Sequence, residues 1–251
     1  MATLSTTWLQ SAGNRALDLL FPPICVSCKA DIDEVLQGIN LCQGCREQIQ
    51  TVTWPTCRRC AARVPEIPGP ISECGHCRDD KLRFDRVFTL GSYEGLLGEL
   101  VVKMKRDRSE RLASLFSMLL IAELGSQLRE LSLDAIVPIP MHRWRRLARG
   151  TNSPASMSDH LGREIGLPVL SKALWRRHNS FPQKGLSRSG RFRNMHRQIE
   201  ARAGYPLEAS HVLLVDDILT TGATCSEASR ALKQAGVAEV SVLVVGRTPS
   251  S

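Results

Sequence analysis

The sequence predicts an α/β fold in which a parallel sheet is flanked by helices and preceded by a small cysteine-rich module. Three observations lead to this prediction. Eight of the nine cysteines lie within residues 25–77. After residue 84, short apolar segments alternate with longer amphipathic segments, which is the pattern of an α/β sheet. With 251 residues and 43% hydrophobic positions, the chain can form one full domain and a smaller module.

Residues 1–20 are expected to form an amphipathic helix. The stretch has no basic leader followed by an uninterrupted apolar run, so it does not resemble a secretory signal. Its apolar side chains recur at helical spacing: Trp8, Leu9, Ala12, Ala16, Leu19 and Leu20. No apolar stretch approaches the roughly 20 residues that cross a bilayer. We therefore expect a soluble, cytoplasmic protein without a transmembrane segment.

The module at residues 21–80 contains four Cys-x-x-Cys pairs. The first and second pairs are separated by the same interval as the third and fourth, which indicates one metal-binding unit duplicated in tandem. Two such pairs complete the tetrahedral thiolate shell that Zn²⁺ prefers. The sequence therefore predicts a double zinc ribbon. The expected ligands are Cys25, Cys28, Cys42 and Cys45 for one ion, and Cys57, Cys60, Cys74 and Cys77 for the other.

Disulfides are the less favoured interpretation of these cysteines, because nothing in the sequence indicates export. Crossed pairing of the four Cys-x-x-Cys pairs stays open. Since thiolates fill each shell, both ions are expected to be structural and not catalytic. The formal net charge is +8, and eight thiolates holding two Zn²⁺ would lower it by four. Nucleic-acid binding by the ribbons stays open, since their loops carry Arg46, Arg58, Arg59 and Arg63.

Residues 81–251 are expected to form the α/β domain. Strands are predicted at 86–93, 134–140, 211–217 and 239–248, and helices at 95–105, 110–128, 153–166 and 223–236. The run VLLVDDILTTGAT at 212–224 joins a predicted strand to a predicted helix. Its strand delivers Asp216 and Asp217 at the carboxyl end, which is where parallel sheets hold their ligands.

The loop after these carboxylates offers hydroxyls and backbone N–H groups at a helix N-terminus, which favours a phosphate. It consists of Thr220, Thr221, Gly222, Ala223 and Thr224. Thr224 and Glu227 are expected to form a capping box. Ribose 5-phosphate suits both parts, because its phosphate can bind the loop while its hydroxyls donate to the carboxylates. The alternatives are a capped helix beside a solvated acidic turn, and the acidic Mg²⁺ pocket of a receiver domain, whose acids would lie nearer the start of the domain.

The run at 212–224 resembles the PRPP-binding motif of type I phosphoribosyltransferases. Nearly the whole chain resembles the ComF/GntX-like family, in which a double zinc ribbon precedes such a domain. Further matches lie around Lys103, at 134–152 and at 176–194. The chain departs from the family at Thr151 and Ser153, where phenylalanine and glutamine are usual, and at Ile199, which replaces a phenylalanine. These departures concern the acceptor pocket more than the PRPP loop.

The resemblance implies a type I phosphoribosyltransferase-like sheet that binds PRPP with Mg²⁺ and displaces pyrophosphate with an unidentified acceptor. The implied catalytic residues are Asp216, Asp217, Lys103 and Arg191. The implied pyrophosphate loop carries Pro138, Pro140, Arg145 and Arg149, and the implied lid carries Gln183 and Asn194. Cys225 is expected to be a small core residue.

The resemblance also implies a link to DNA uptake in competence or to DNA utilisation, with single-stranded DNA or DNA-uptake proteins as partners. The alternative to an enzyme is a non-catalytic protein of the same fold. Such a protein would sense a nucleotide or handle single-stranded DNA.

Overall fold

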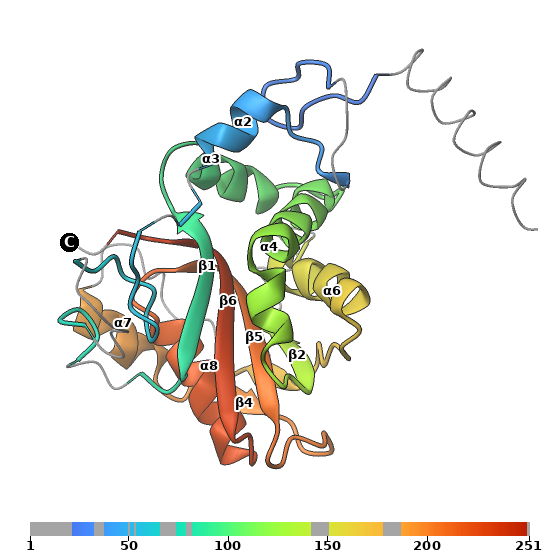
Figure 1. Cartoon of the computed structure of the whole chain (residues 1–251). Helices are drawn as coiled ribbons and strands as arrows, with labels where there is room; N and C mark the ends of the chain where they lie inside the picture. Colours follow the sequence, from blue (N-terminus) through green and yellow to red (C-terminus); the bar gives the residue numbers. More distant parts are fainter. Residues whose placement is uncertain are drawn as a thin grey trace, which may run out of the picture. The chain divides into compact units, whose positions relative to one another are not determined.

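The structure is a computed structural model (Figure 1). It describes residues 22–32, 38–49, 51–52, 54–65, 74–78, 82–141, 151–177 and 187–249. The predicted N-terminal helix, Arg145, Arg149 and Gln183 lie outside the described residues. The chain divides into two compact units, Met1–Gln48 and Ile49–Ser251. The predicted domain boundaries at residues 20 and 80 stay predictions.

The first Cys-x-x-Cys knuckle of each unit has the same backbone geometry. In the first unit, the Cys25 N–H donates to the Ala30 carbonyl at 2.8 Å, and an isolated bridge pairs Ile24 with Asp31. In the second unit, the Cys57 N–H donates to the Ala62 carbonyl at 2.8 Å, and a bridge pairs Thr56 with Arg63. The residue that follows the second cysteine of these two knuckles has a positive φ, 68° at Lys29 and 54° at Ala61. The two knuckles are thus repeats in structure as well as in sequence. Helix α2 (Gln43–Gln48) follows in the first unit.

The second unit is built on a four-stranded parallel sheet with the order β1-β6-β5-β2. The strands are β1 (Arg86–Ser92), β2 (Ala135–Pro138), β5 (His211–Leu219) and β6 (Glu239–Arg247). Their inner residues are buried almost without interruption, as expected for a sheet covered on both faces. Because all three pairings are parallel, the carboxyl ends of the four strands meet at one edge. The predicted parallel α/β sheet is confirmed.

Five helices and a second, two-stranded sheet accompany this sheet in the part of the chain that the structure describes. The helices are α3 (Gly95–Met104), α4 (Arg111–Arg129), α6 (Ser153–Ile165), α7 (Arg188–Met195) and α8 (Ala223–Gln234). Strands β3 (Leu174–Arg176) and β4 (Ile199–Ala201) form an antiparallel pair. Helix α6 packs against α4, β2 and β5, whereas α8 packs against β4, β5 and β6 (Figure 1). Among the described residues, no helix is both long and apolar enough to cross a membrane.

The second cysteine cluster is part of the core of the second unit. Its four cysteines belong to the same buried cluster as Val212 and Leu214 of β5 and Leu232 of α8. Leu82 and Phe84, which link the ribbon to β1, are buried in this cluster too. The second ribbon therefore shares one hydrophobic core with the sheet and does not form a separate domain.

Candidate functional site

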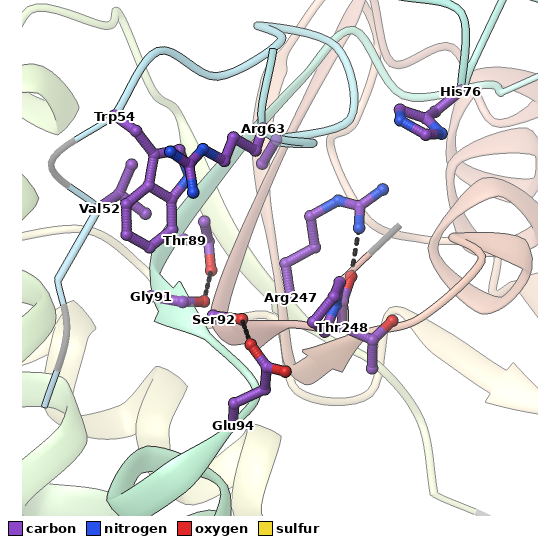
Figure 2. Close-up of a pocket in the computed structure, with 12 residues that line it drawn as sticks. Val52, Trp54, Arg63, His76, Thr89, Gly91, Ser92, Glu94, Arg247 and Thr248 are labelled. Atoms are coloured by element: carbon purple, nitrogen blue, oxygen red, sulfur yellow. Dashed lines mark hydrogen bonds between the residues drawn. The ribbon is translucent and has the colours of Figure 1, made fainter. Parts of the chain in front are cut away.

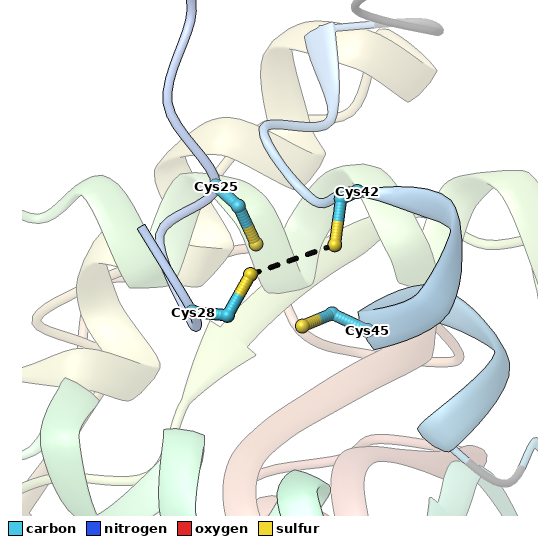
Figure 3. A group of neighbouring side chains, drawn as sticks. All are labelled: Cys25, Cys28, Cys42 and Cys45. Atoms are coloured by element: carbon cyan, nitrogen blue, oxygen red, sulfur yellow. Dashed lines mark hydrogen bonds between the residues drawn. The ribbon is translucent and has the colours of Figure 1, made fainter. Parts of the chain in front are cut away.

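The eight paired cysteines form two groups that fit zinc. The groups are Cys25, Cys28, Cys42 and Cys45 (Figure 3), and Cys57, Cys60, Cys74 and Cys77, with the sulfur atoms of each group within 4.8 Å of one another. The Cys28 and Cys42 sulfurs are 3.6 Å apart, and those of Cys60 and Cys74 are also 3.6 Å apart. These distances are far longer than a disulfide bond of about 2.05 Å. They are close to the edge of about 3.8 Å that a Zn–S tetrahedron with bonds of about 2.3 Å requires. The uncrossed grouping predicted from the sequence is confirmed.

The two carboxylates lie near the carboxyl end of β5. This strand extends two residues beyond the predicted end, because Ile218 and Leu219 continue to pair with β6. The Asp217 carboxylate forms an ion pair with Lys105, whose Nζ lies 3.2 Å from Asp217 Oδ2. The backbone N–H of Asp217 donates to Asp216 Oδ1 at 2.8 Å. The site therefore combines two adjacent acids with one ammonium group.

Burial controls the ionisation of Asp216. Desolvation, with repulsion from Asp217, raises the pKa of Asp216 to about 7. The buried Cys225 thiol donates to Asp216 Oδ2 at 3.8 Å, and burial raises the pKa of this thiol well above its ordinary value. Cys225 is therefore a neutral core residue beneath Asp216, as expected, and not an activated nucleophile.

The raised pKa of Asp216 predicts that its ionisation destabilises the fold. Because the pKa of Asp216 is higher in the folded than in the unfolded state, the protonated acid stabilises the fold at pH values below the unfolded pKa. This contribution is lost as the pH rises through the folded-state pKa of about 7. The Asp216→Asn variant escapes this loss. We expect its free energy of unfolding, relative to wild type, to rise by about 2 kcal/mol between pH 5.5 and pH 8.5. Urea unfolding of both proteins across this range measures the difference. A difference that does not change with pH would contradict the prediction.

The loop after β5 leads into α8 through a left-handed residue. Gly222 is the N-cap of α8 with a φ of 79°, and a Cβ at this position would approach the Phe84 ring to 3.3 Å. Both features require glycine. The Thr221 hydroxyl lies 3.4 Å from the Ala223 N–H. The predicted capping box is wrong: α8 begins at Ala223, so Thr224 lies inside the helix, and Glu227 binds Arg230 at 2.7 Å instead.

The structure brings some of the predicted site residues together and places others elsewhere. Pro138 ends β2, and Pro140 follows it at the carboxyl edge that also holds the acid pair. Arg191 and Asn194 lie on α7. Lys103 is exposed in the last turn of α3, whereas Lys105, two residues later, reaches Asp217. Sequence reasoning missed Lys105 because both lysines belong to one basic run, and only the end of α3 decides which of them faces the acids.

The arrangement defines the class of the molecule: a double zinc ribbon followed by a phosphoribosyltransferase-type α/β domain. Residues 16–78 match the family model of the double zinc ribbon domain, and residues 157–251 match that of the phosphoribosyl transferase domain. The chain is 31% identical over 168 residues to the DNA utilization protein YhgH of Escherichia coli strain K12, covering 66% of this chain and 73% of that protein. The chain belongs to the ComF-like family.

The chain is also similar to two further proteins. The Competence protein F of Haemophilus influenzae is 28% identical over 229 residues, covering 89% of this chain and 96% of that protein. A solved structure of glutamine PRPP amidotransferase from B. subtilis matches with a TM-score of 0.36 and 19% sequence identity. The match covers 53% of this chain and 26% of that enzyme.

Proposed function

We propose that the second unit binds PRPP with Mg²⁺ and transfers its phosphoribosyl group to an acceptor, with release of pyrophosphate. One observation carries the proposal: β5 places Asp216 and Asp217 directly before a threonine and glycine loop that opens α8. Carboxylates for sugar hydroxyls and amides for a phosphate thus lie on one short segment. Few ligands other than a ribose 5-phosphate need both groups so close together.

In this proposal the 5-phosphate binds residues 220–224 and the ribose hydroxyls donate to the acid pair. Asp216 and Asp217 would orient the sugar, and Asp216, with a pKa of about 7, is suited to accept a proton from an acceptor N–H. The pyrophosphate would lie over Pro138 and Pro140 at the end of β2, near the predicted Arg145 and Arg149. Mg²⁺ would neutralise charge on the leaving pyrophosphate, held by the sugar hydroxyls and the pyrophosphate itself. Gln183, Arg191 and Asn194 would belong to the lid that excludes water.

Lys105 is proposed as the cation that binds the pyrophosphate once the sugar hydroxyls take over Asp217. Its Nζ already lies in the site, 3.2 Å from Asp217 Oδ2. We expect Lys105→Met to weaken PRPP binding about tenfold or more, because a charged hydrogen bond is worth about 1.5–3 kcal/mol. Lys103→Met is the matched control, since Lys103 is exposed on the same basic run. Calorimetric titration with PRPP and Mg²⁺ compares them. If Lys103→Met has the larger effect, the role of Lys105 is wrong.

A screen for pyrophosphate release across amines, nucleobases and planar acids tests the transferase activity. The second candidate function is non-catalytic: the fold would sense a nucleotide or handle single-stranded DNA. The names of the relatives, which refer to competence and DNA utilisation, favour it. Tight PRPP binding without pyrophosphate release, together with binding of single-stranded DNA, would support this second function. DNA partners, DNA-uptake proteins and a cytoplasmic location stay predictions.

A further inference from the structure

A cavity of about 290 Å³ lies between the second ribbon and the carboxyl ends of β1 and β6 (Figure 2). The ribbon contributes Trp54, Arg63 and His76 to its walls, β6 contributes Arg247, and Glu94 comes from the N-cap of α3. This volume is at the lower end of the range for small-molecule sites, about 300–1,000 Å³. It suits a molecule of one or two rings and excludes a folded macromolecule.

Arg247 is a buried cation with no carboxylate partner among the described residues. Only 7% of this residue is exposed. Its Nε donates to the Cys60 carbonyl at 2.7 Å, and its Nη1 donates to the Thr248 carbonyl. No carboxylate of the described residues forms an ion pair with Arg247. Glu94 lines the same cavity but accepts a hydrogen bond from Ser92 at 2.8 Å. Two guanidinium groups, those of Arg63 and Arg247, and one carboxylate, that of Glu94, line the cavity, so its charge favours an anionic ligand.

The opposite wall of the cavity is aromatic. The Arg63 guanidinium lies over the Trp54 ring, 5.3 Å from its centroid, in a cation–π contact. Figure 2 shows this pair facing the cavity from the ribbon, with Arg247 rising from the sheet. A planar ring is the ligand shape that such a wall contacts best.

The cavity adjoins the proposed ribose site through the pairing of β5 and β6. Arg247 is the register partner of Leu219, the residue before Thr220 of the phosphate loop. The Thr248 N–H donates to the Leu219 carbonyl at 3.0 Å. A ligand on Arg247 is therefore one strand away from the loop that would hold PRPP.

We propose that this cavity binds a small planar acid, an aromatic or heteroaromatic carboxylate, with its carboxylate on Arg247 and its ring beside Trp54. The role of this acid as the acceptor rests on the proposed function, whereas its binding to the cavity is independent of that function. In the transfer, the lone pair of a nitrogen on the acid forms the bond to C1 of PRPP. The C1–O bond to pyrophosphate breaks, and the electron pair leaves on pyrophosphate. An N–H acceptor then loses its proton to Asp216 or to solvent.

Calorimetric titration of the full zinc-loaded chain with matched acids and amides tests the binding. The probes are pyridine-3-carboxylate, 2-aminobenzoate and quinoline-2-carboxylate, each compared with its carboxamide, with and without PRPP and Mg²⁺. We expect at least one acid to bind at least tenfold more tightly than its amide. Arg247→Lys should weaken that acid at least tenfold, because lysine lacks the bidentate fork. Trp54→Leu, on the opposite wall, should weaken acid and amide alike.

Zinc content and PRPP affinity are measured for both variants, so that loss of acid binding is separated from loss of the fold. The proposal is overturned if no acid binds, if acids and amides bind equally, or if adenine or inorganic phosphate binds more tightly than the acids. Acid binding without PRPP binding would refute the proposed function and leave the cavity assignment intact. PRPP binding with none of the acids bound would refute the cavity assignment and leave the proposed function intact.

Discussion

Replacing both Asp216 and Asp217 with asparagine is expected to lower the affinity for PRPP at least 100-fold. In the proposed complex these carboxylates accept the hydrogen bonds of the ribose hydroxyls, and each such bond to a charged group is worth about 1.5–3 kcal/mol. Two of them correspond to about a 100-fold change or more in Kd. Calorimetric titration with PRPP and Mg²⁺ measures the loss. The variant should stay folded, because asparagine has nearly the same shape as aspartate.

Asp159→Asn is the control for the double variant. Asp159 is an exposed acid on α6, so its removal changes the net charge by one without touching the acid pair. We expect its PRPP affinity to match that of wild type within about twofold. An unchanged affinity in the double variant would show that PRPP binds elsewhere or not at all. An equal loss in Asp159→Asn would show that the loss does not come from the acid pair, because removing an exposed negative charge cannot by itself weaken the attraction of the protein for a polyanion.

The features that the sequence predicted correctly are those that a short stretch of chain determines. Two cysteines separated by two residues form one knuckle wherever the module lies, so spacing alone predicts four knuckles, whereas the structure shows how they combine into two groups. A continuous apolar run such as 212–215 is buried on both faces, which identifies a parallel strand before any partner is known. Asp216, Asp217 and Gly222 lie within seven residues of one another, so one strand and one turn fix their relative positions.

The features that the sequence did not reveal depend on contacts between distant segments. Lys105 reaches Asp217 because of where α3 ends. Arg247 and Trp54 line one cavity only because the second ribbon packs into the core of the sheet. The capping box was wrong for a local reason: Gly222 starts α8 in a left-handed conformation two residues earlier, and Glu227 is held by Arg230. A capping pattern alone does not distinguish a helix that begins at threonine from one that has already begun.

Loss of the second zinc should damage the sheet domain as a whole. Cys60 is only 3% exposed and belongs to the core that contains Val212, Val240 and Leu232. Its carbonyl also accepts the hydrogen bond from Arg247. We expect Cys60→Ser to contain about one zinc per chain instead of about two, as measured by metal analysis. Its melting temperature should fall by about 10 °C or more, because several kcal/mol of metal-binding energy are lost from the folded state of a domain of this size.

Cys28→Ser is the matched variant in the first cluster, because it also removes one zinc ligand but lies in the other compact unit at an exposed position. We expect it to lose about one zinc while PRPP affinity and the main thermal transition stay close to wild type. Cys60→Ser should lower both the PRPP affinity and the melting temperature, since Gly222 of the phosphate loop packs against Leu82 and Phe84 at the end of the ribbon. Equal melting temperatures and equal PRPP affinities in the two variants would mean that the second ribbon does not stabilise the sheet. The opposite result would show that its zinc stabilises the wall on which both the phosphate loop and the Arg247 cavity depend.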